Sequence, residues 1–245
     1  MKCVRGLSSS FLCFALLLTG CVTITDKGRT EGKRVAVKAN PIEKAQSRIT
    51  LGLAYLEQGD KIRALENFQK AYQHAPSYYR AQLTLAHYYE LVGNNQRAQT
   101  FYSQAMATHR TNGDVLHLYA TYLCKQGNYR EADTLFNRAI ALPNYVGIAD
   151  SYENAGFCAL KSGNSQRAQH YFARTLDYDA NRPNSLLQLA KLEIDDDLLV
   201  QARARLMQFN QIYGARKSSL KLLVTLETQA GNISLAQRYQ NQITP

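Results

Sequence analysis

Small and apolar residues recur along this chain with a period of about 34 residues. Five of the six periods contain a Gly-Asp or Gly-Asn pair, and Asp197 takes the place of the Gly in the other one. An Ala follows five residues after this position, and usually an aromatic residue or Leu four residues later. The first position of the pair is held by Gly59, Gly93, Gly127, Gly163, Asp197 and Gly231. This period predicts two antiparallel helices per unit, because Gly suits a helix C-terminus and Asp or Asn suits the start of the next helix.

Six such units cover residues 45–245 and begin at residues 45, 79, 113, 149, 183 and 217. One unit alone cannot cover its own apolar face, so neighbouring units must stack. The pattern resembles the tetratricopeptide repeat. That resemblance implies an all-α fold, a right-handed superhelical solenoid of six repeats, each a pair of antiparallel helices. Two extra residues between units three and four predict a longer loop there, around residues 142–147.

The N-terminus is predicted to be a targeting segment. Residues 1–20 contain two cations followed by an apolar stretch that is too short to span a bilayer. The tetrapeptide that ends in Cys21 resembles the lipobox of bacterial lipoproteins, which implies cleavage before Cys21 and acylation of its thiol. The alternative is a plain secretory signal. In this family Asp after the Cys retains the protein in the inner membrane, so Val22 implies sorting to the outer membrane.

Residues 21–44 are predicted to be the lipidated Cys and a flexible tether, because they have no apolar period and more basic than acidic residues. They form either a solvated linker or a segment in weak contact with anionic lipid headgroups or glycan phosphates.

The composition, 45% apolar and 20% charged, is that of a globular protein. The formal net charge of +10 falls to +8 when Lys2 and Arg5 are removed with the signal. Such a charge is compatible with nucleic-acid binding, but a periplasmic address argues against it. No nucleic acid is therefore expected as a partner.

The first helix of each unit is expected to line the concave groove of the solenoid, with positions 2, 5, 9 and 12 facing it. The groove residues predicted from units one and two are Gln46, Ile49, Leu53, Leu56, Leu83 and His87. The face of unit one is apolar, and an exposed apolar strip usually marks a binding site for a peptide strand or helix. Alternatively, Ile49 and Leu53 are covered by the tether or by unit two.

The sequence contains no motif for catalysis, for a cofactor or for a small-molecule substrate. None of the five histidines forms a metalloprotease pair, although His87 and His117 lie on adjacent groove helices. Residues 195–197 are three consecutive aspartates, but they occupy the turn between two helices and are expected to be solvated. We therefore expect no enzyme activity, no catalytic residues and no metal site.

Two cysteines remain for the mature domain. Cys3 and Cys13 lie in the signal and Cys21 is predicted to be acylated, which leaves Cys124 and Cys158 in an oxidising compartment. They fall on the first helices of two stacked units, so a disulfide between them is the favoured interpretation. By loop entropy it would stabilise the fold by roughly 3–4 kcal/mol. Two small buried side chains are the alternative.

The lipobox and the six repeats together resemble the PilF/PilW family, the lipoprotein pilotins of type IV pilus assembly. Residues 53–60, 122–127 and 152–158, with their two cysteines, resemble stretches of its first, third and fourth repeats. The resemblance implies a non-enzymatic, periplasm-facing lipoprotein on the inner leaflet of the outer membrane. It would bind the secretin and promote its outer-membrane localisation and multimerisation. The alternative is a scaffold for outer-membrane β-barrel assembly or cell-wall synthesis.

Overall fold

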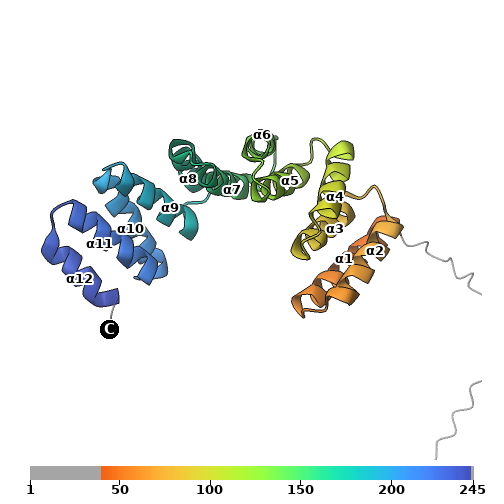
Figure 1. Cartoon of the computed structure of the whole chain (residues 1–245), viewed down its shortest axis with the longest axis horizontal. Helices are drawn as coiled ribbons and strands as arrows, with labels where there is room; N and C mark the ends of the chain where they lie inside the picture. Colours follow the sequence, from red (N-terminus) through yellow and green to blue (C-terminus); the bar gives the residue numbers. More distant parts are fainter. Residues whose placement is uncertain (1–39, 244–245) are drawn as a thin grey trace, which may run out of the picture. The chain divides into compact units, whose positions relative to one another are not determined.

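The computed structural model describes residues 40–243, which contain only α-helices and the turns between them (Figure 1). In chain order these helices are α1 (Pro41–Glu57), α2 (Lys61–His74), α3 (Tyr79–Leu91), α4 (Asn95–Thr108), α5 (Gly113–Lys125), α6 (Tyr129–Ile140), α7 (Ile148–Lys161), α8 (Ser165–Tyr178), α9 (Pro183–Asp195), α10 (Leu199–Tyr213), α11 (Lys217–Gln229) and α12 (Ile233–Ile243).

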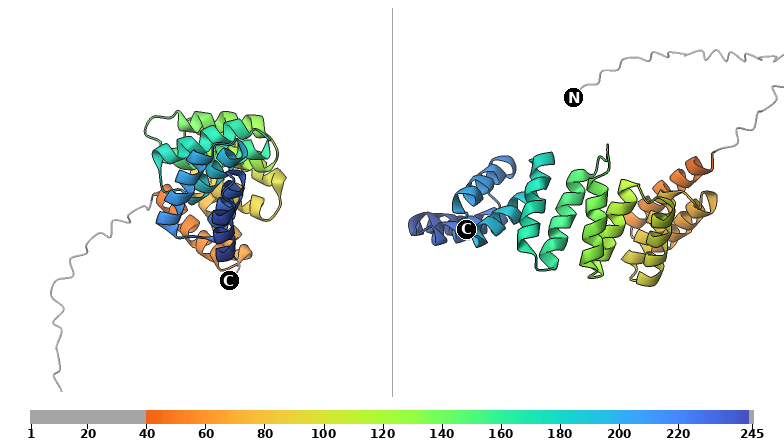
Figure 2. Two further views of the ribbon diagram at one scale, coloured as in Figure 1. Left: turned by 90° about the vertical axis from the view of Figure 1, so that its left-hand side faces the viewer. Right: turned by 90° about the horizontal axis from the view of Figure 1, so that it is seen from above.

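Each odd-numbered helix forms a pair with the even-numbered helix that follows it, and successive pairs stack side by side (Figure 2). The turn inside each pair depends on one residue in the left-handed region. Gly59 has φ of 79°, and Asp197 at the equivalent place has φ of 60°. Asp60 and its equivalents then begin the second helix; the Asp60 side chain accepts a bond from the Arg63 amide. The predicted all-α solenoid of six tetratricopeptide repeats is thereby confirmed.

Within a pair, a small residue on the first helix faces a large side chain on the second. Gly52 on α1 faces Phe68 on α2, and a Cβ at position 52 would overlap the Phe68 ring. Gly156 on α7 faces Phe172 on α8 in the same way. The recurring small residues therefore allow the two helices to approach closely, as their period predicts.

The repeat domain begins earlier than the sequence pattern indicates. Helix α1 starts at Pro41, so residues 41–44, which were expected in the tether, are helical. Asn40 caps this helix by accepting a hydrogen bond from the Ile42 amide at 3.0 Å, and Pro41 occupies the first helical position, where its missing N–H costs nothing. The Asn-Pro pair was the local signal for this start.

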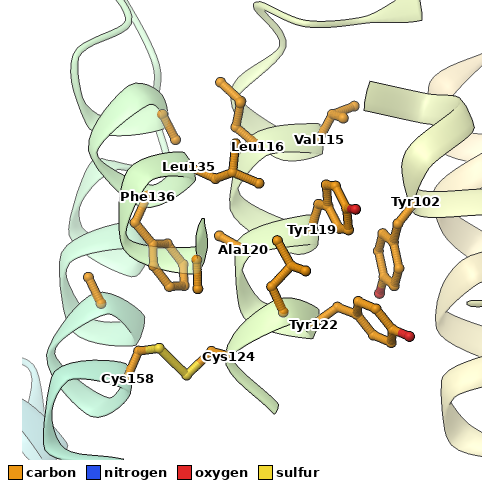
Figure 3. Close-up of a cluster of buried hydrophobic side chains, with 14 of the residues drawn as sticks. Tyr102, Val115, Leu116, Tyr119, Ala120, Tyr122, Cys124, Leu135, Phe136 and Cys158 are labelled. Atoms are coloured by element: carbon orange, nitrogen blue, oxygen red, sulfur yellow. A yellow bond between two sulfur atoms is a disulfide. The ribbon is translucent and has the colours of Figure 1, made fainter. Parts of the chain in front are cut away.

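The core between repeats two, three and four is rich in aromatic rings (Figure 3). Tyr102 on α4 contacts Tyr119 and Tyr122 on α5, with ring centroids 5.7 and 4.8 Å apart. Beyond repeat four a second cluster, built mainly from leucines, fills the space between α9, α10 and α11. The stacking of units is thus achieved with aromatic side chains in one region and aliphatic ones in another.

Within residues 40–243, no helix is both long and apolar enough to cross a bilayer. The predicted signal peptide (1–20), the acylated Cys21 and most of the predicted tether lie outside the described residues.

Candidate partner-binding groove

A groove with a volume of about 510 Å³ opens where the first helices of repeats one, two and three meet. Helices α1, α3 and α5 form its floor and walls, and the loop before α7 closes one side. Its volume lies within the range of ordinary ligand pockets. The apolar lining comes from Ile49, Leu53, Leu83, Leu118 and Val146.

Four of the six predicted groove residues line this groove: Ile49, Leu53, Leu83 and His87. Their exposure differs, since Ile49 and Leu83 are each 6% exposed whereas Leu53 is 41% exposed. Leu53 therefore offers the larger free apolar surface, while the other two form the floor beneath it.

The other two predicted residues lie outside the groove. Gln46 donates a hydrogen bond to the Tyr78 hydroxyl at 3.0 Å, which holds it near the start of α3. Leu56 is half-buried and packs against the hydrophobic core. Leu56, at position 12, lies about one turn nearer the C-terminus of α1 than Leu53 at position 9. At this turn the side chain packs on the core and does not line the groove.

Repeat two covers part of the unit-one face, which was one of the two alternatives. Ile49 is buried in a small cluster with Ala45 and with Ala81 on α3. Leu53, one turn further along α1, stays exposed. The unit-one face is thus a partly covered apolar surface that continues into repeats two and three.

The rim of the groove is polar. Its lining includes the exposed side chains of Arg80 on α3, Asp114 on α5 and Asp150 on α7. Asp150 forms an ion pair with Arg182 at 2.5 Å, whereas Asp114 accepts only a long hydrogen bond from the Tyr79 hydroxyl, at 3.3 Å. The groove therefore combines an apolar floor with an acidic edge.

His117 lies in the wall beside this acidic edge. Asn154 donates to its Nε2 at 3.2 Å, so Nδ1 carries the proton and donates to the Ser151 hydroxyl at 2.9 Å. Burial lowers the pKa of His117 below its ordinary value, and the charges of Asp150 and Asp114 oppose that shift only in part. A neutral His117 thus serves as a fixed link between α5 and α7.

Sequence reasoning missed several residues of the groove, among them Tyr79, Tyr145 and Val146. Tyr79 is the first residue of its repeat, one place before the positions that were counted. Tyr145 and Val146 belong to the loop between α6 and α7, where the repeat is two residues longer than the 34-residue period. The length of that loop was the available signal, but its path depends on packing that the sequence pattern does not contain.

Cys124 on α5 and Cys158 on α7 form a disulfide, with their Cα atoms 5.8 Å apart (Figure 3). Both cysteines are buried. The bond joins the first helices of repeats three and four at the end opposite the long loop.

Between residues 40 and 243, no group of three or more His, Cys, Asp or Glu side chains could hold a metal ion. His87 is exposed, Asp195 is the last residue of α9, and Asp196 and Asp197 lie in the turn after it. In that turn, Asp196 and Asp197 accept hydrogen bonds from Gln169 and Gln229, at 3.3 and 3.1 Å.

Comparison with known proteins identifies the family of this chain. A tetratricopeptide-repeat model matches residues 45–78, the first predicted unit. The type IV pilus assembly protein PilF of Pseudomonas aeruginosa is 30% identical over 219 residues, which span 86% of this chain and 82% of PilF. The chain belongs to the PilF family. It is therefore a tetratricopeptide-repeat protein of type IV pilus biogenesis.

Solved structures agree with this family assignment. The structure of P. aeruginosa PilF superposes with a TM-score of 0.74 at 28% identity, over 83% of this chain and 91% of that one. PilW, described as a widely conserved type IV pilus biogenesis factor, superposes with a TM-score of 0.71 at 23% identity, over 81% of this chain and 91% of PilW. The PilW match supports the fold alone.

Proposed function

We propose that this protein is a non-enzymatic outer-membrane lipoprotein that binds the type IV pilus secretin and promotes its outer-membrane localisation and multimerisation. The observation that carries the proposal is the match to a type IV pilus assembly protein over 86% of this chain. A match of that extent must include most of the repeat array, so we infer that the repeats serve the same process.

The groove supports a binding function. Its apolar floor and polar rim are the arrangement that peptide-binding grooves use to hold an extended or helical segment. Leu53 lines the groove above this floor and is 41% exposed, and we propose it as the main contact with the secretin.

The disulfide supports a location in the periplasm, because such bonds form and persist in oxidising compartments. We propose that acyl chains on Cys21 hold the protein on the inner leaflet of the outer membrane, since several chains together anchor stably where one does not. Residues 22–40 would then tether the repeats to that surface. Confinement there raises the effective concentration of the groove near the secretin.

Deletion of the gene followed by complementation tests this proposal. Outer-membrane extracts are run on an unboiled gel and probed for the secretin, with complementation by wild type, Cys21→Ser, Leu53→Asp and Leu198→Asp. Leu198 is the matched control, because it is 40% exposed against 41% for Leu53 and lies outside the groove. We expect the high-mass secretin band to disappear on deletion and to return in full only with wild type and Leu198→Asp.

Two results would overturn the proposal. Unchanged secretin multimers and unchanged twitching in the deletion strain would remove the secretin function and favour a scaffold for β-barrel assembly or cell-wall synthesis. Full complementation by Leu53→Asp would remove the groove from the proposal.

A further inference from the structure

The loop between repeats three and four is built into the groove wall. Tyr145 is half-buried and packs on two glycines, Gly113 at the start of α5 and Gly147 just before α7. A Cβ at either glycine would overlap Tyr145. Two positions without side chains therefore accommodate one tyrosine, and this packing fixes the path of the loop.

The loop between α6 and α7 presents an apolar side chain, that of Val146, to solvent. Asn144 has φ of 62°, a left-handed conformation that Asn tolerates better than most residues. Val146, two residues later, lines the groove and is 98% exposed. Leu118 on α5 also lines the groove and is 39% exposed. An apolar strip that runs from Leu53 to Val146 is thus left uncovered.

The carboxylate beside this strip lacks a cation. Asp114 is exposed, and within the described residues no Lys, Arg or His lies within ion-pair distance of it. The neighbouring Asp150 is different, since Arg182 already binds it. A partner that brings a positive charge to this edge would gain an interaction that the protein itself does not supply.

We propose that the groove recognises a secretin segment in which an apolar side chain lies next to a Lys or Arg, with Val146 contacting the apolar side chain and Asp114 the cation. The inference rests on the proposed function and names the chemistry of the segment that the groove binds. Val146 then determines specificity by apolar contact, and Asp114 by charge.

Purified variants of the mature chain test this inference, with the soluble periplasmic region of the same bacterium's pilus secretin as the probe. The groove variants are Val146→Asp, Asp114→Asn and Asp114→Lys. Val200→Asp and Glu66→Lys are the controls, because Val200 is 75% exposed on α10, Glu66 is an exposed acid on α2, and neither lines the groove. Leu53→Asp reports on the groove itself. Thermal melts confirm that each variant is folded.

We expect Val146→Asp to raise the Kd at least about tenfold, as loss of a buried apolar contact does. Asp114→Asn should raise the Kd about two- to fivefold and weaken its dependence on salt, because a rim ion pair is screened. Asp114→Lys should have a larger effect, and a Lys→Glu or Arg→Glu change in the bound secretin segment should restore binding. Both controls should bind like wild type.

The outcomes separate this inference from the proposed function. If Leu53→Asp abolishes binding while Val146→Asp and both Asp114 variants bind like wild type, the inference is overturned and the secretin function stands. If the wild-type chain does not bind the secretin probe, the proposed function and the inference fail together.

Discussion

The first two repeats and the last two carry different kinds of side chain at the same position of the repeat, an aromatic ring in one region and a carboxylate in the other. At position 11 of the repeat, repeats one and two carry Tyr55 and Tyr89. Arg63 lies over the Tyr55 ring, 4.8 Å from its centroid, and Arg97 lies 5.2 Å from that of Tyr89 and donates to its hydroxyl at 3.0 Å. An aromatic ring therefore occupies the position, and an arginine covers it.

Repeats five and six place glutamates at this position. Glu193 is 4% exposed and accepts two bonds from Arg205, at 2.7 and 2.8 Å. Glu227 is 1% exposed and accepts bonds from both nitrogens of the Arg203 fork, at 2.7 and 2.8 Å. Both carboxylates are thus buried and paired.

The difference shows that this position must hold a large side chain whose polar atoms are hydrogen-bonded. It does not have to be one particular residue. A tyrosine meets the requirement without moving a charge out of water, and its arginine adds a modest cation–π contact. A glutamate meets it only while its arginine is present, because an unpaired buried charge is costly. The last two repeats should therefore be the ones that depend on single polar contacts.

The largest effect is expected at the disulfide, which lies between these two regions. The double variant Cys124→Ser/Cys158→Ser should lower the free energy of unfolding by about 3–4 kcal/mol, because the bond closes a loop of 34 residues. It should also let repeats one to three and repeats four to six unfold in separate steps, since repeats couple only to their neighbours. Urea denaturation followed by circular dichroism measures both effects.

A reductant provides the control for the disulfide. It should destabilise the wild type in the same way and leave the double variant unchanged. An equal loss of stability in both proteins would contradict the stabilising role of the disulfide.

The ion pair of repeat six comes next. Arg203→Ala should destabilise the protein by about 3 kcal/mol, because it leaves the Glu227 carboxylate buried without its cation. Arg97→Ala in repeat two should cost only about 1 kcal/mol, since the ring left behind is neutral. Thermal and urea unfolding of the two variants provide the measurement.

A double variant sharpens that comparison. Arg203→Met/Glu227→Leu should be much closer to wild type than Arg203→Ala, because replacement of both charges removes the unpaired carboxylate. If the double variant is the less stable of the two, the cost lies in lost packing and the comparison of charges is wrong.

The third effect concerns how closely the two helices of a repeat approach. Gly52→Ala should destabilise repeat one by about 1–3 kcal/mol, because the new methyl group overlaps the Phe68 ring. Repeat five has Ala190 and Leu206 at the corresponding positions. Phe68→Leu should therefore recover part of the stability lost in Gly52→Ala, and a double-mutant cycle measures that recovery. Purely additive effects would show that the two positions do not interact.

The smallest effect is the pH dependence that the two buried glutamates give to the last two repeats. The Arg203 hydrogen bonds lower the pKa of Glu227, so the stability that this carboxylate contributes is present above its ordinary pKa and is lost as pH falls through the lowered value. Burial raises the pKa of Glu193 in spite of Arg205, so its ionisation reduces stability as pH rises from the ordinary to the raised value.

These opposite signs can be separated by titration of the unfolding free energy between pH 3 and pH 7. Glu227→Gln should reduce the loss of stability on acidification, and Glu193→Gln should make that loss steeper. Tyr55→Phe in repeat one serves as the control and should leave the pH profile of stability unchanged over this range. A shift of the same sign in both glutamine variants would contradict the assignment.

Much of the fold could be predicted because repetition averages out local ambiguity. One Gly-Asp pair is a weak turn signal, but the same pair at Gly59 and its equivalents in further units determines where helices end. Asp197 could be placed in a left-handed turn only because it stood where a Gly was expected, and its φ of 60° agrees. The start of α1 was misplaced because Asn40 and Pro41 lie outside the repeating register.

The groove could be predicted only in part. Counting along a helix found Leu53 and Leu83, because side-chain direction follows from helical geometry. It also chose Leu56, which packs on the core, because counting does not show how deeply a neighbouring helix covers each turn. Val146 could not be found in this way, since a loop has no period.

The sequence by itself determined the helix pairs, their order and the small residues that let them pack, because these depend on local propensity repeated in register. The tertiary structure alone decided what the stacked units expose. The covered Ile49 beside the open Leu53, the Tyr145 that fixes Val146 in the groove wall, and the unpaired Asp114 each result from contacts between repeats. Such contacts depend on the angle and depth at which one helix pair meets the next, and those are properties of packing in three dimensions.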